Sequence, residues 1–400
     1  MYSDSSFMSL SDIIVHHSIV DCLVSLESSS SNISNCSISD FLSNGNSTVF
    51  QAMSSSIIVD FLYLDNIRSS KIMLLSNSSG LLSDSSINNT DCDGSMFQMV
   101  DSKLLFVNGT TSFSSFKYFV YMDSSILDCH GLLVQGSELN SFIQSTESII
   151  SLSQFKSDVT NFNEVFTKIS HSFMNSSFLT FVNSVITTIS SVNHSLLECR
   201  HIQLHNVSFT CPIVSSLFHS SDSELLLSNV YGGVIDIPVI NSTNCVISCF
   251  EVQFSCTFPG TAIYVSSSDF RLFNSDVIVL SNRYIYSFDS ELFLQGITIS
   301  CTVQNIEPLF DLYHKQLKSN LFDLRFSNIT VTDLFITNTI SHHLFFSDNS
   351  RMNISHACFS NIFLTSAVHC MNTIIQLNNF EFEDIEVLEH FITLLIPFVL

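Results

Sequence analysis

Four stretches of the chain share the pattern apolar–x–Asn–apolar or Ser at nearly constant spacing: Phe181-Val182-Asn183-Ser184, Leu204-His205-Asn206-Val207, Leu227-Ser228-Asn229-Val230 and Leu272-Phe273-Asn274-Ser275. Two further stretches fill the series with Glu and Gly in place of Asn: Cys249-Phe250-Glu251-Val252 and Leu294-Gln295-Gly296-Ile297. The steps between neighbouring members are 23, 23, 22, 23 and 22 residues. A fixed period of this length is the signature of a repeat architecture.

Each repeat is filled by short β-branched and aromatic runs, such as residues 263–265 and 297–299, separated by Ser, Asn and Asp. Runs of this kind bounded by turn formers predict strands rather than helices. We therefore predict an all-β parallel β-helix of about 16 coils with a period of about 22–25 residues. A leucine-rich repeat is the alternative, but that pattern needs Leu at several fixed positions, and Phe competes with Leu here.

The series continues more loosely in both directions, so we expect one continuous, incomplete solenoid over residues 1–400. The apolar tail 391–400 is expected to be a truncated coil or the start of an anchor. Longer steps between 294 and 326 and between 326 and 359 predict surface loops around residues 313–316 and 337–339. Within the coils, apolar side chains should point inward and Ser and Thr outward.

The repeated Asn has a physical reason, because Asn tolerates the left-handed backbone of a sharp bend and stacked Asn side chains can form hydrogen-bonded ladders. The predicted ladder consists of Asn66, Asn89, Asn108, Asn183, Asn206, Asn229, Asn274, Asn328 and Asn361. Three of these begin Asn-x-Ser/Thr sequons, of which the chain has 12. We expect ladder asparagines packed in turns to be poor acceptors of N-linked glycans.

The series resembles the right-handed parallel β-helix superfamily that includes the pectin lyases. Residues 231–235, Tyr-Gly-Gly-Val-Ile, are similar to the Gly-Gly-Ala-Ile motif of polymorphic outer-membrane-protein-like repeat surface proteins. The companion Phe-x-x-Asn motif of those proteins fits residues 41–44 and 346–349. The resemblance implies a right-handed coil and a secreted or surface-exposed solenoid used in adhesion or carbohydrate contact.

A catalytic reading starts from the residues around 89–94 and 128–131, which look similar to the active-site motifs of polygalacturonases on the same fold. The candidates are Asp91, Asp93, Asp128 and His130. Two carboxylates held apart can activate a water and protonate a leaving oxygen. However, no Asp-Asp pair follows Asp91 by one coil, Cys129 stands where the family has Gly, and no Arg-x-Lys follows. These departures favour turn and loop roles for the four residues.

Metal and cysteine chemistry offer few leads. Glu381 and Glu383 would share one face of a strand and are candidates for a Ca²⁺ site, with a solvated charged edge as the alternative. No Cys-x-x-Cys motif is present, and no cofactor is expected. The 12 cysteines are either buried as small hydrophobes or paired. The candidate pairs are Cys22 with Cys36, Cys199 with Cys211, Cys245 or Cys249 with Cys256, and Cys358 with Cys370.

The composition limits the partners. A formal net charge of −23 argues against binding nucleic acid or an anionic membrane surface. The N-terminus lacks the basic and then apolar pattern of a signal peptide, yet the resemblance places the chain outside the cell or on its surface. We expect a non-enzymatic secreted or cell-surface β-solenoid with a structural or adhesive role. A polysaccharide-degrading hydrolase or lyase is the alternative. The expected partners are carbohydrate or another surface protein, with end-to-end self-association through the C-terminal coil.

Overall fold

The computed structural model describes residues 2–4, 6–42, 47–210, 216–257, 260–279, 283–300 and 320–395. Within these ranges the chain is all β and coils into a right-handed parallel β-solenoid of about 15 turns, which confirms the fold class predicted from the repeat. The described residues include no helix with the length and hydropathy needed to cross a membrane. The chain divides into two compact units, Met1–Pro212 and Ile213–Leu400, which are described separately.

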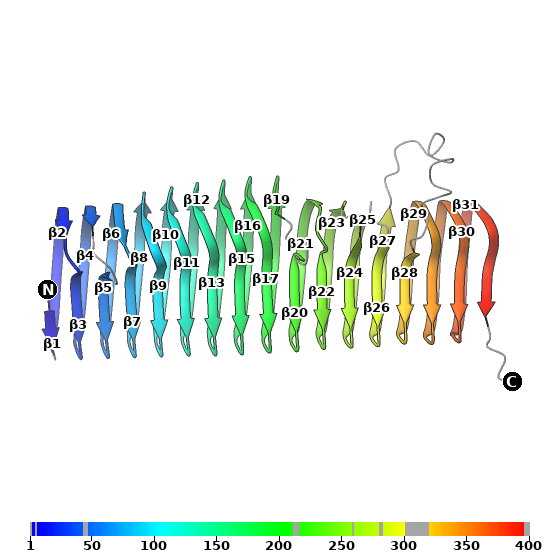
Figure 1. Cartoon of the computed structure of the whole chain (residues 1–400), viewed down its shortest axis with the longest axis horizontal. Coiled ribbons are helices and arrows are strands. Elements are labelled where there is room, and N and C mark those ends of the chain that lie inside the picture. Colours follow the sequence, from blue (N-terminus) through cyan, green and yellow to red (C-terminus); the bar gives the residue numbers. More distant parts are fainter. Residues whose placement is uncertain are drawn as a thin grey trace. The chain divides into compact units, whose positions relative to one another are not determined.

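The first unit consists of strands that alternate between two parallel columns (Figure 1). The even-numbered strands form one column and pair in the order β2, β4, β6, β8 and onward to β18, while the odd-numbered strands form the other. The bounds are β1 (Tyr2–Asp4), β2 (Phe7–Ile19), β3 (Cys22–Glu27), β4 (Ser30–Leu42), β5 (Thr48–Met53), β6 (Ser56–Ser69), β7 (Lys71–Ser76), β8 (Ser79–Asn88), β9 (Asp91–Val100), β10 (Lys103–Ser112), β11 (Ser115–Asp123), β12 (Ile126–Gln135), β13 (Glu138–Thr146), β14 (Ile149–Asp158), β15 (Asn161–Ser170), β16 (Phe173–Val182), β17 (Val185–Asn193), β18 (Leu196–His205) and β19 (Ser208–Phe209).

The second unit repeats this arrangement, with one column through β21, β23, β25 and β27 and another through β20, β22, β24, β26 and β28. Its last three strands are long enough to run through both columns, so that β29 pairs with β27 and with β28. The bounds are β20 (Phe218–Ser221), β21 (Glu224–Ile235), β22 (Ile240–Thr243), β23 (Val246–Cys256), β24 (Thr261–Ser266), β25 (Asp269–Val279), β26 (Arg283–Phe288), β27 (Glu291–Ser300), β28 (Asn320–Arg325), β29 (Asn328–Asp348), β30 (Arg351–Met371) and β31 (Ile374–Leu395).

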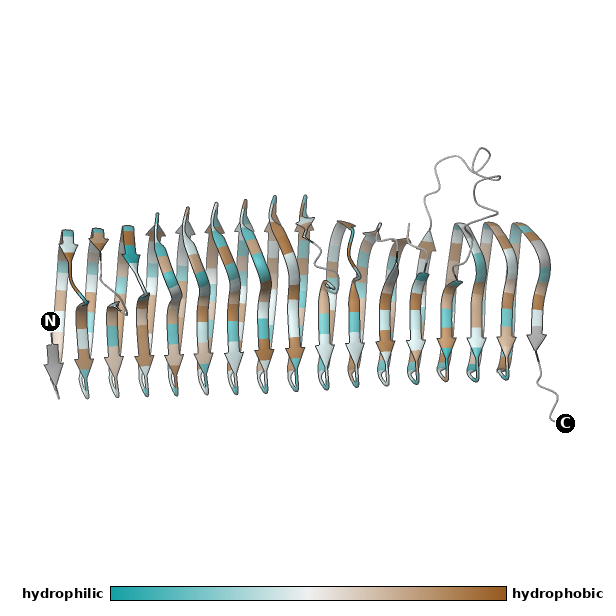
Figure 2. Cartoon of the chain, viewed as in Figure 1, coloured by the Kyte–Doolittle hydropathy of each residue, from teal (hydrophilic) through white to brown (hydrophobic). Residues whose placement is uncertain are grey.

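The core of each unit is the interior of its coils, into which alternate side chains of every strand point. Along the strands, hydrophobic and hydrophilic residues alternate accordingly (Figure 2). In the first unit Phe119, Phe142 and Phe166 come from successive coils and stack with ring centroids 4.7 and 5.0 Å apart. Each coil repeats the same inward positions, so similar side chains pack on one another in successive coils. The stacked aromatic rings are stabilised by ring–ring contacts in addition to the burial of their apolar surface.

The coil corners are made by residues in the left-handed backbone region, which recur at three positions in the coils of the first unit and at two in the coils that contain β21, β23 and β25. We call the set that includes Asn108, Asn229 and Asn274 the first bend column, because these residues occupy equivalent places in the strand pairing. The second bend column includes Asn66, Asn89, Asn183, Asn206 and Asn361, about five residues further along each coil. Eight of the nine predicted ladder asparagines therefore adopt positive φ, but they belong to two columns rather than one.

Asn328 is the exception among the predicted ladder residues. It opens β29 as an exposed residue of ordinary strand backbone, and the left-handed residue of that corner is Phe326, with φ of 52°. The prediction for Asn328 is wrong because Phe326 to Ile329 matched the apolar–x–Asn–apolar pattern in a different part of the coil.

The step from 326 to 359 is likewise not an insertion. Thr337 pairs with Ser360 and Ile336 with Phe359, 23 positions later, so the coil has ordinary length. Residues 337–339 lie within β29 and do not project as a loop, which corrects the expectation. The earlier long coil is real, because Leu294 pairs with Val331, 37 positions later. The loop expected at residues 313–316 lies outside the described residues.

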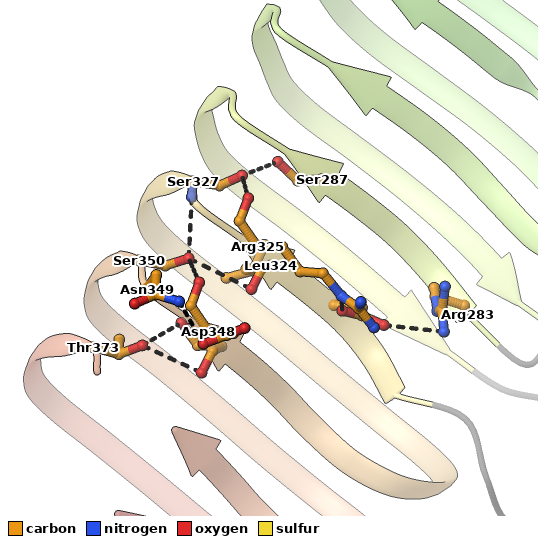
Figure 3. A network of polar contacts seen from close by, with 11 residues as sticks. Arg283, Ser287, Leu324, Arg325, Ser327, Asp348, Asn349, Ser350 and Thr373 are labelled. Carbon is orange, nitrogen blue, oxygen red and sulfur yellow. Dashed lines mark hydrogen bonds and ion pairs between the residues drawn. The ribbon is translucent and has the colours of Figure 1, made fainter. Parts of the chain in front are cut away.

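A buried serine ladder forms the third corner, which contradicts the expectation that Ser and Thr point outward. In the first unit, a serine directly follows the left-handed residue of the third corner. Its hydroxyl oxygen accepts a hydrogen bond from the backbone amide of the equivalent residue in the preceding coil. The members are Ser29, Ser55, Ser78, Ser102, Ser125, Ser148, Ser172 and Ser195. In the second unit the amide of Ser327 donates to Ser350 Oγ in the same way, and in the next coil the hydroxyl of Thr373 donates to the carbonyl oxygens of Met371 and Ser347 (Figure 3).

Candidate functional site

A groove of about 560 Å³ lies on the surface of the second unit. It crosses the first residues of β25, β27, β29 and β30, which are neighbours in one parallel column. At about 4.8 Å per strand, the four strands give a groove roughly 14 Å long along the solenoid axis. We call it the β25–β30 groove. Its outward-facing side chains are those of Asp269, Arg271, Phe273, Glu291, Phe293, Asn328, Thr330, Arg351 and Asn353.

The strand register explains this composition. Asp269, Glu291, Asn328 and Arg351 pair in succession and form one row of outward side chains. Arg271, Phe293, Thr330 and Asn353 form the second row, two residues further along each strand. The residues between the rows, such as Leu292 and Ile329, are buried in the coil interior. The groove is therefore built entirely on rigid, paired strands.

The hollow exists because an aromatic stack stops. Phe250 and Phe273 stack with ring centroids 4.7 Å apart, and Phe293 follows at 5.5 Å from Phe273 with an interplanar angle of 45°. The partner of Phe293 in the next coil is Thr330, whose side chain is too small to cover a phenyl ring. One side of the Phe293 ring thus faces the groove.

The charges of the groove balance. Asp269 and Glu291 supply two carboxylates, and Arg271 and Arg351 supply two guanidinium groups. Arg271 binds Asp269 through two hydrogen bonds, of 3.2 Å from Nε and 2.6 Å from an Nη nitrogen. These hydrogen bonds to Asp269 raise the pKa of Arg271. The result is a pocket with donors, acceptors and an apolar floor but no net charge, in a chain of formal charge −23.

The catalytic candidates from the sequence do not assemble. Asp91 and Asp93 lie on β9, which pairs with β7 and β11, whereas Asp128 and His130 lie on β12, which pairs with β10 and β14. The two pairs therefore occupy different columns of the solenoid. His130 has Nδ1 at 2.6 Å from Ser153 Oγ of the next coil and is exposed. This places it in a surface hydrogen bond rather than beside a carboxylate.

The Ca²⁺ candidates Glu381 and Glu383 are both exposed on β31, where they pair with Cys358 and Ser360. Among the residues that the structure describes, no group of three His, Cys, Asp or Glu side chains is placed to hold a metal ion. The two glutamates thus form an exposed acidic edge of the strand.

The described cysteines are free thiols, including both members of the candidate pairs Cys22 with Cys36 and Cys358 with Cys370. Cys211 lies outside the described residues. Burial raises the pKa of the Cys129, Cys199 and Cys249 thiols to about 12. These residues pack in the coil interior as small apolar side chains.

The sequence did not reveal a second polar cluster of this unit, around Asp323 on β28. Its side chain is 1 % exposed and forms ion pairs with Arg283, at 3.0 Å, and Arg325, at 3.2 Å (Figure 3). Both guanidinium groups also lie over the Tyr286 ring, at 5.2 and 5.7 Å. The arginines do not follow the period because they occupy different places in their strands: Arg283 lies three residues before Tyr286, the strand partner of Asp323, whereas Arg325 lies two residues after Asp323. The cluster joins the adjacent strands β26 and β28, and it holds one carboxylate between two guanidinium groups.

Comparisons with known proteins identify no family for this chain. No protein-family model matches the chain, and no curated protein matches it. Among solved structures, the chain is similar to the PL6 family alginate lyase AlyGC at 8% identity and a TM-score of 0.16, over 89% of this chain and 86% of that chain. An arginine-to-alanine mutant of the same lyase gives 8% identity and a TM-score of 0.17, over 98% and 95% of the two chains. Neither similarity identifies a family or a substrate for this chain.

Proposed function

We propose that this chain is a non-enzymatic β-solenoid of a secreted or cell-surface protein, and that it binds a neutral carbohydrate in the β25–β30 groove. The observation that carries the proposal is the uncovered face of Phe293 between charge-balanced hydrogen-bonding groups. Ligand sites combine an apolar surface with a few placed polar groups that fix orientation. The groove has this composition on a scaffold of paired strands.

Sugar chemistry fits both parts of the groove. The C–H face of a pyranose ring is apolar and packs on an aromatic ring such as Phe293. Its hydroxyls accept hydrogen bonds from Arg351 and Asn353 and donate to the Glu291 carboxylate. Charged groups make stronger hydrogen bonds than neutral ones, and they gain most where the ligand excludes water.

Charge favours a neutral saccharide over a uronate polymer. The two arginines of the groove are matched by Asp269 and Glu291, so no surplus positive charge faces the ligand. Around the groove the chain carries a formal net charge of −23, which repels a polyanion at long range. A neutral saccharide needs no surplus positive charge in the groove and is not repelled by the net negative charge of the chain.

The test is direct binding to the folded chain. A panel of neutral and uronate-containing oligosaccharides is screened, and hits are titrated by calorimetry. We expect Phe293→Ala and Arg351→Ala to weaken binding at least tenfold. The matched control is Phe335→Ala, because Phe335 is a phenylalanine on the adjacent strand β29, is 48 % exposed and lies outside the groove. Equal affinity in all four proteins would overturn the assignment of the groove.

A polysaccharide-degrading activity is the second candidate, because Asp269 and Glu291 are paired partners on adjacent strands within the groove. Two neighbouring carboxylates are the groups that glycoside hydrolysis requires. The bidentate bond from Arg271 to Asp269 favours a structural role for that carboxylate. Release of reducing ends from a bound oligosaccharide, abolished by Glu291→Gln, would establish hydrolysis and displace the non-enzymatic proposal.

A further inference from the structure

Two sequons converge on the groove. Asn328-Ile329-Thr330 and Asn353-Ile354-Ser355 lie at the starts of β29 and β30, and Asn328, Thr330 and Asn353 all line the β25–β30 groove. Thr330 and Asn353 are direct partners in the strand pairing. Residues of both sequons therefore line the proposed ligand site.

Of the two asparagines, Asn328 is the better acceptor. It is exposed, whereas Asn353 is half-buried. Its backbone is an ordinary extended strand start and not one of the left-handed corners where the Asn side chains of the columns hydrogen-bond to neighbouring coils. In the strand pairing, Asn328 lies between Glu291 and Arg351, at the rim of the groove.

We propose that Asn328 is an N-glycosylation site whose glycan covers the β25–β30 groove and blocks it. The modification rests on the secreted or cell-surface part of the proposed function, and the blocking rests on the saccharide site. In the reaction, the Nδ2 amide of Asn328 forms a bond to C1 of a sugar carried on a lipid diphosphate. The C1–O bond to the diphosphate breaks, the amide nitrogen loses one proton, and the lipid diphosphate leaves.

The geometry makes the modification inhibitory. A glycan is bulky and hydrophilic and extends from its attachment atom. Attached between Glu291 and Arg351, it occupies the space over Phe293 and offers its own hydroxyls to the same groups as a free saccharide would. Because it is tethered, its effective concentration at the groove is in the millimolar range or above, which free ligand must exceed.

The experiment compares the full chain made in bacteria with the full chain made behind a cleavable leader in glycosylating cells. Peptide mass spectrometry reads the occupancy of Asn328 and of Asn32, an exposed sequon on β4 of the first unit with ordinary strand backbone, which serves as the control acceptor. We expect Asn328 to be occupied and saccharide binding to be at least tenfold weaker than for the bacterial protein. Asn328→Gln made in the same cells should restore binding, whereas Asn32→Gln should not.

A second readout separates this inference from the proposed function. Phenylglyoxal labelling measures the accessibility of Arg351 relative to Arg68, an exposed arginine of the first unit. If the bacterial protein binds no saccharide, the proposed function fails, yet protection of Arg351 in the glycosylated protein still supports a glycan over the groove. An unmodified Asn328 beside an occupied Asn32, or an occupied Asn328 with Arg351 fully labelled and binding unchanged, would overturn the inference.

Discussion

The backbone amide of Ser125 donates a hydrogen bond of 3.1 Å to Oγ of Ser148, one coil further along the first unit. The Ser148 hydroxyl in turn donates to the carbonyl oxygen of Thr146, at 2.6 Å. Both serines are 2 % exposed. A corner amide that has no strand partner is thereby satisfied without water, and the same pair of bonds recurs from coil to coil.

Removing one rung of the serine ladder should destabilise the first unit. Ser148→Ala leaves the buried amide of Ser125 without its acceptor, which costs about 1–3 kcal/mol in the free energy of unfolding. Urea unfolding followed by circular dichroism measures the change. Ser151→Ala is the control, because Ser151 is exposed on β14 and should change stability by less than about 0.5 kcal/mol. A loss as small for Ser148 as for Ser151 would count against the ladder.

The corner asparagines should differ from Asn328. Asn206 has φ of 51° and donates to Asn183 Oδ1 over 2.7 Å. Asn206→Ala loses that bond and places in the left-handed region a residue that tolerates it less well than asparagine. We expect a loss of about 1–2 kcal/mol, mainly from backbone conformation since the side chain is exposed. Asn328→Ala should be nearly neutral. Urea unfolding measures the free energy of unfolding of both variants. Equal losses of stability in Asn206→Ala and Asn328→Ala would show that the left-handed backbone of Asn206 is not the cause.

Completing the aromatic stack should close the groove. Thr330→Phe places a ring beside Phe293, in the space that the small threonine leaves open. We expect loss of saccharide binding with little change in the thermal midpoint, because Thr330 faces outward and no core side chain has to move. Thr330→Val, of similar size to Thr, is the control and should retain binding. Undiminished affinity in Thr330→Phe would locate the ligand elsewhere.

The buried thiols predict instability at alkaline pH. Burial raises the pKa of Cys129 from 9.0 to about 12, and the same holds for Cys199 and Cys249. The folded state therefore favours the neutral thiol, and this stabilisation is present below pH 9 and is lost as the pH rises towards 12. Urea midpoints measured from pH 8 to 11 should fall. Cys129→Val, which has no ionisable group, should reduce the fall; an unchanged slope would argue against titration of this thiol.

An acid-sensitive group lies in the second unit. Burial, followed by the neighbouring imidazoles of His342 and His369, lowers the pKa of His343 to about 4. The ring centroids of those neighbours are 4.0 and 4.9 Å away. The unfolded chain takes up the proton first, so stability is lost as the pH falls from 6.5 towards 4. His343→Gln should flatten this part of the pH–stability profile, and a profile as steep as that of the unaltered chain would contradict the assignment.

Much of the fold could be predicted from the sequence because a parallel β-helix repeats the same local problem in every coil. Leu227, Cys249, Leu272 and Leu294 carry the period, and the structure pairs them in that order. The sequence pattern did not correctly predict which asparagines occupy the same position in successive coils. The corner at Asn229 and the corner at Asn206 both accept Asn for the same backbone reason, so a pattern centred on Asn merges two columns that differ in place.

The groove could not be predicted, and the reason is physical. Asp269, Glu291 and Arg351 are ordinary outward residues of β-strands, and their proximity depends on strand pairing across a 37-residue coil that breaks the period. The sequence by itself determined the coil, its inward apolar positions and its left-handed corners, because these follow from side-chain volume and backbone preference within one repeat. Only the tertiary structure decided which outward residues share a surface, that serine is buried at the third corner, and that Thr330 leaves Phe293 uncovered, since each of these depends on what the next coil places alongside.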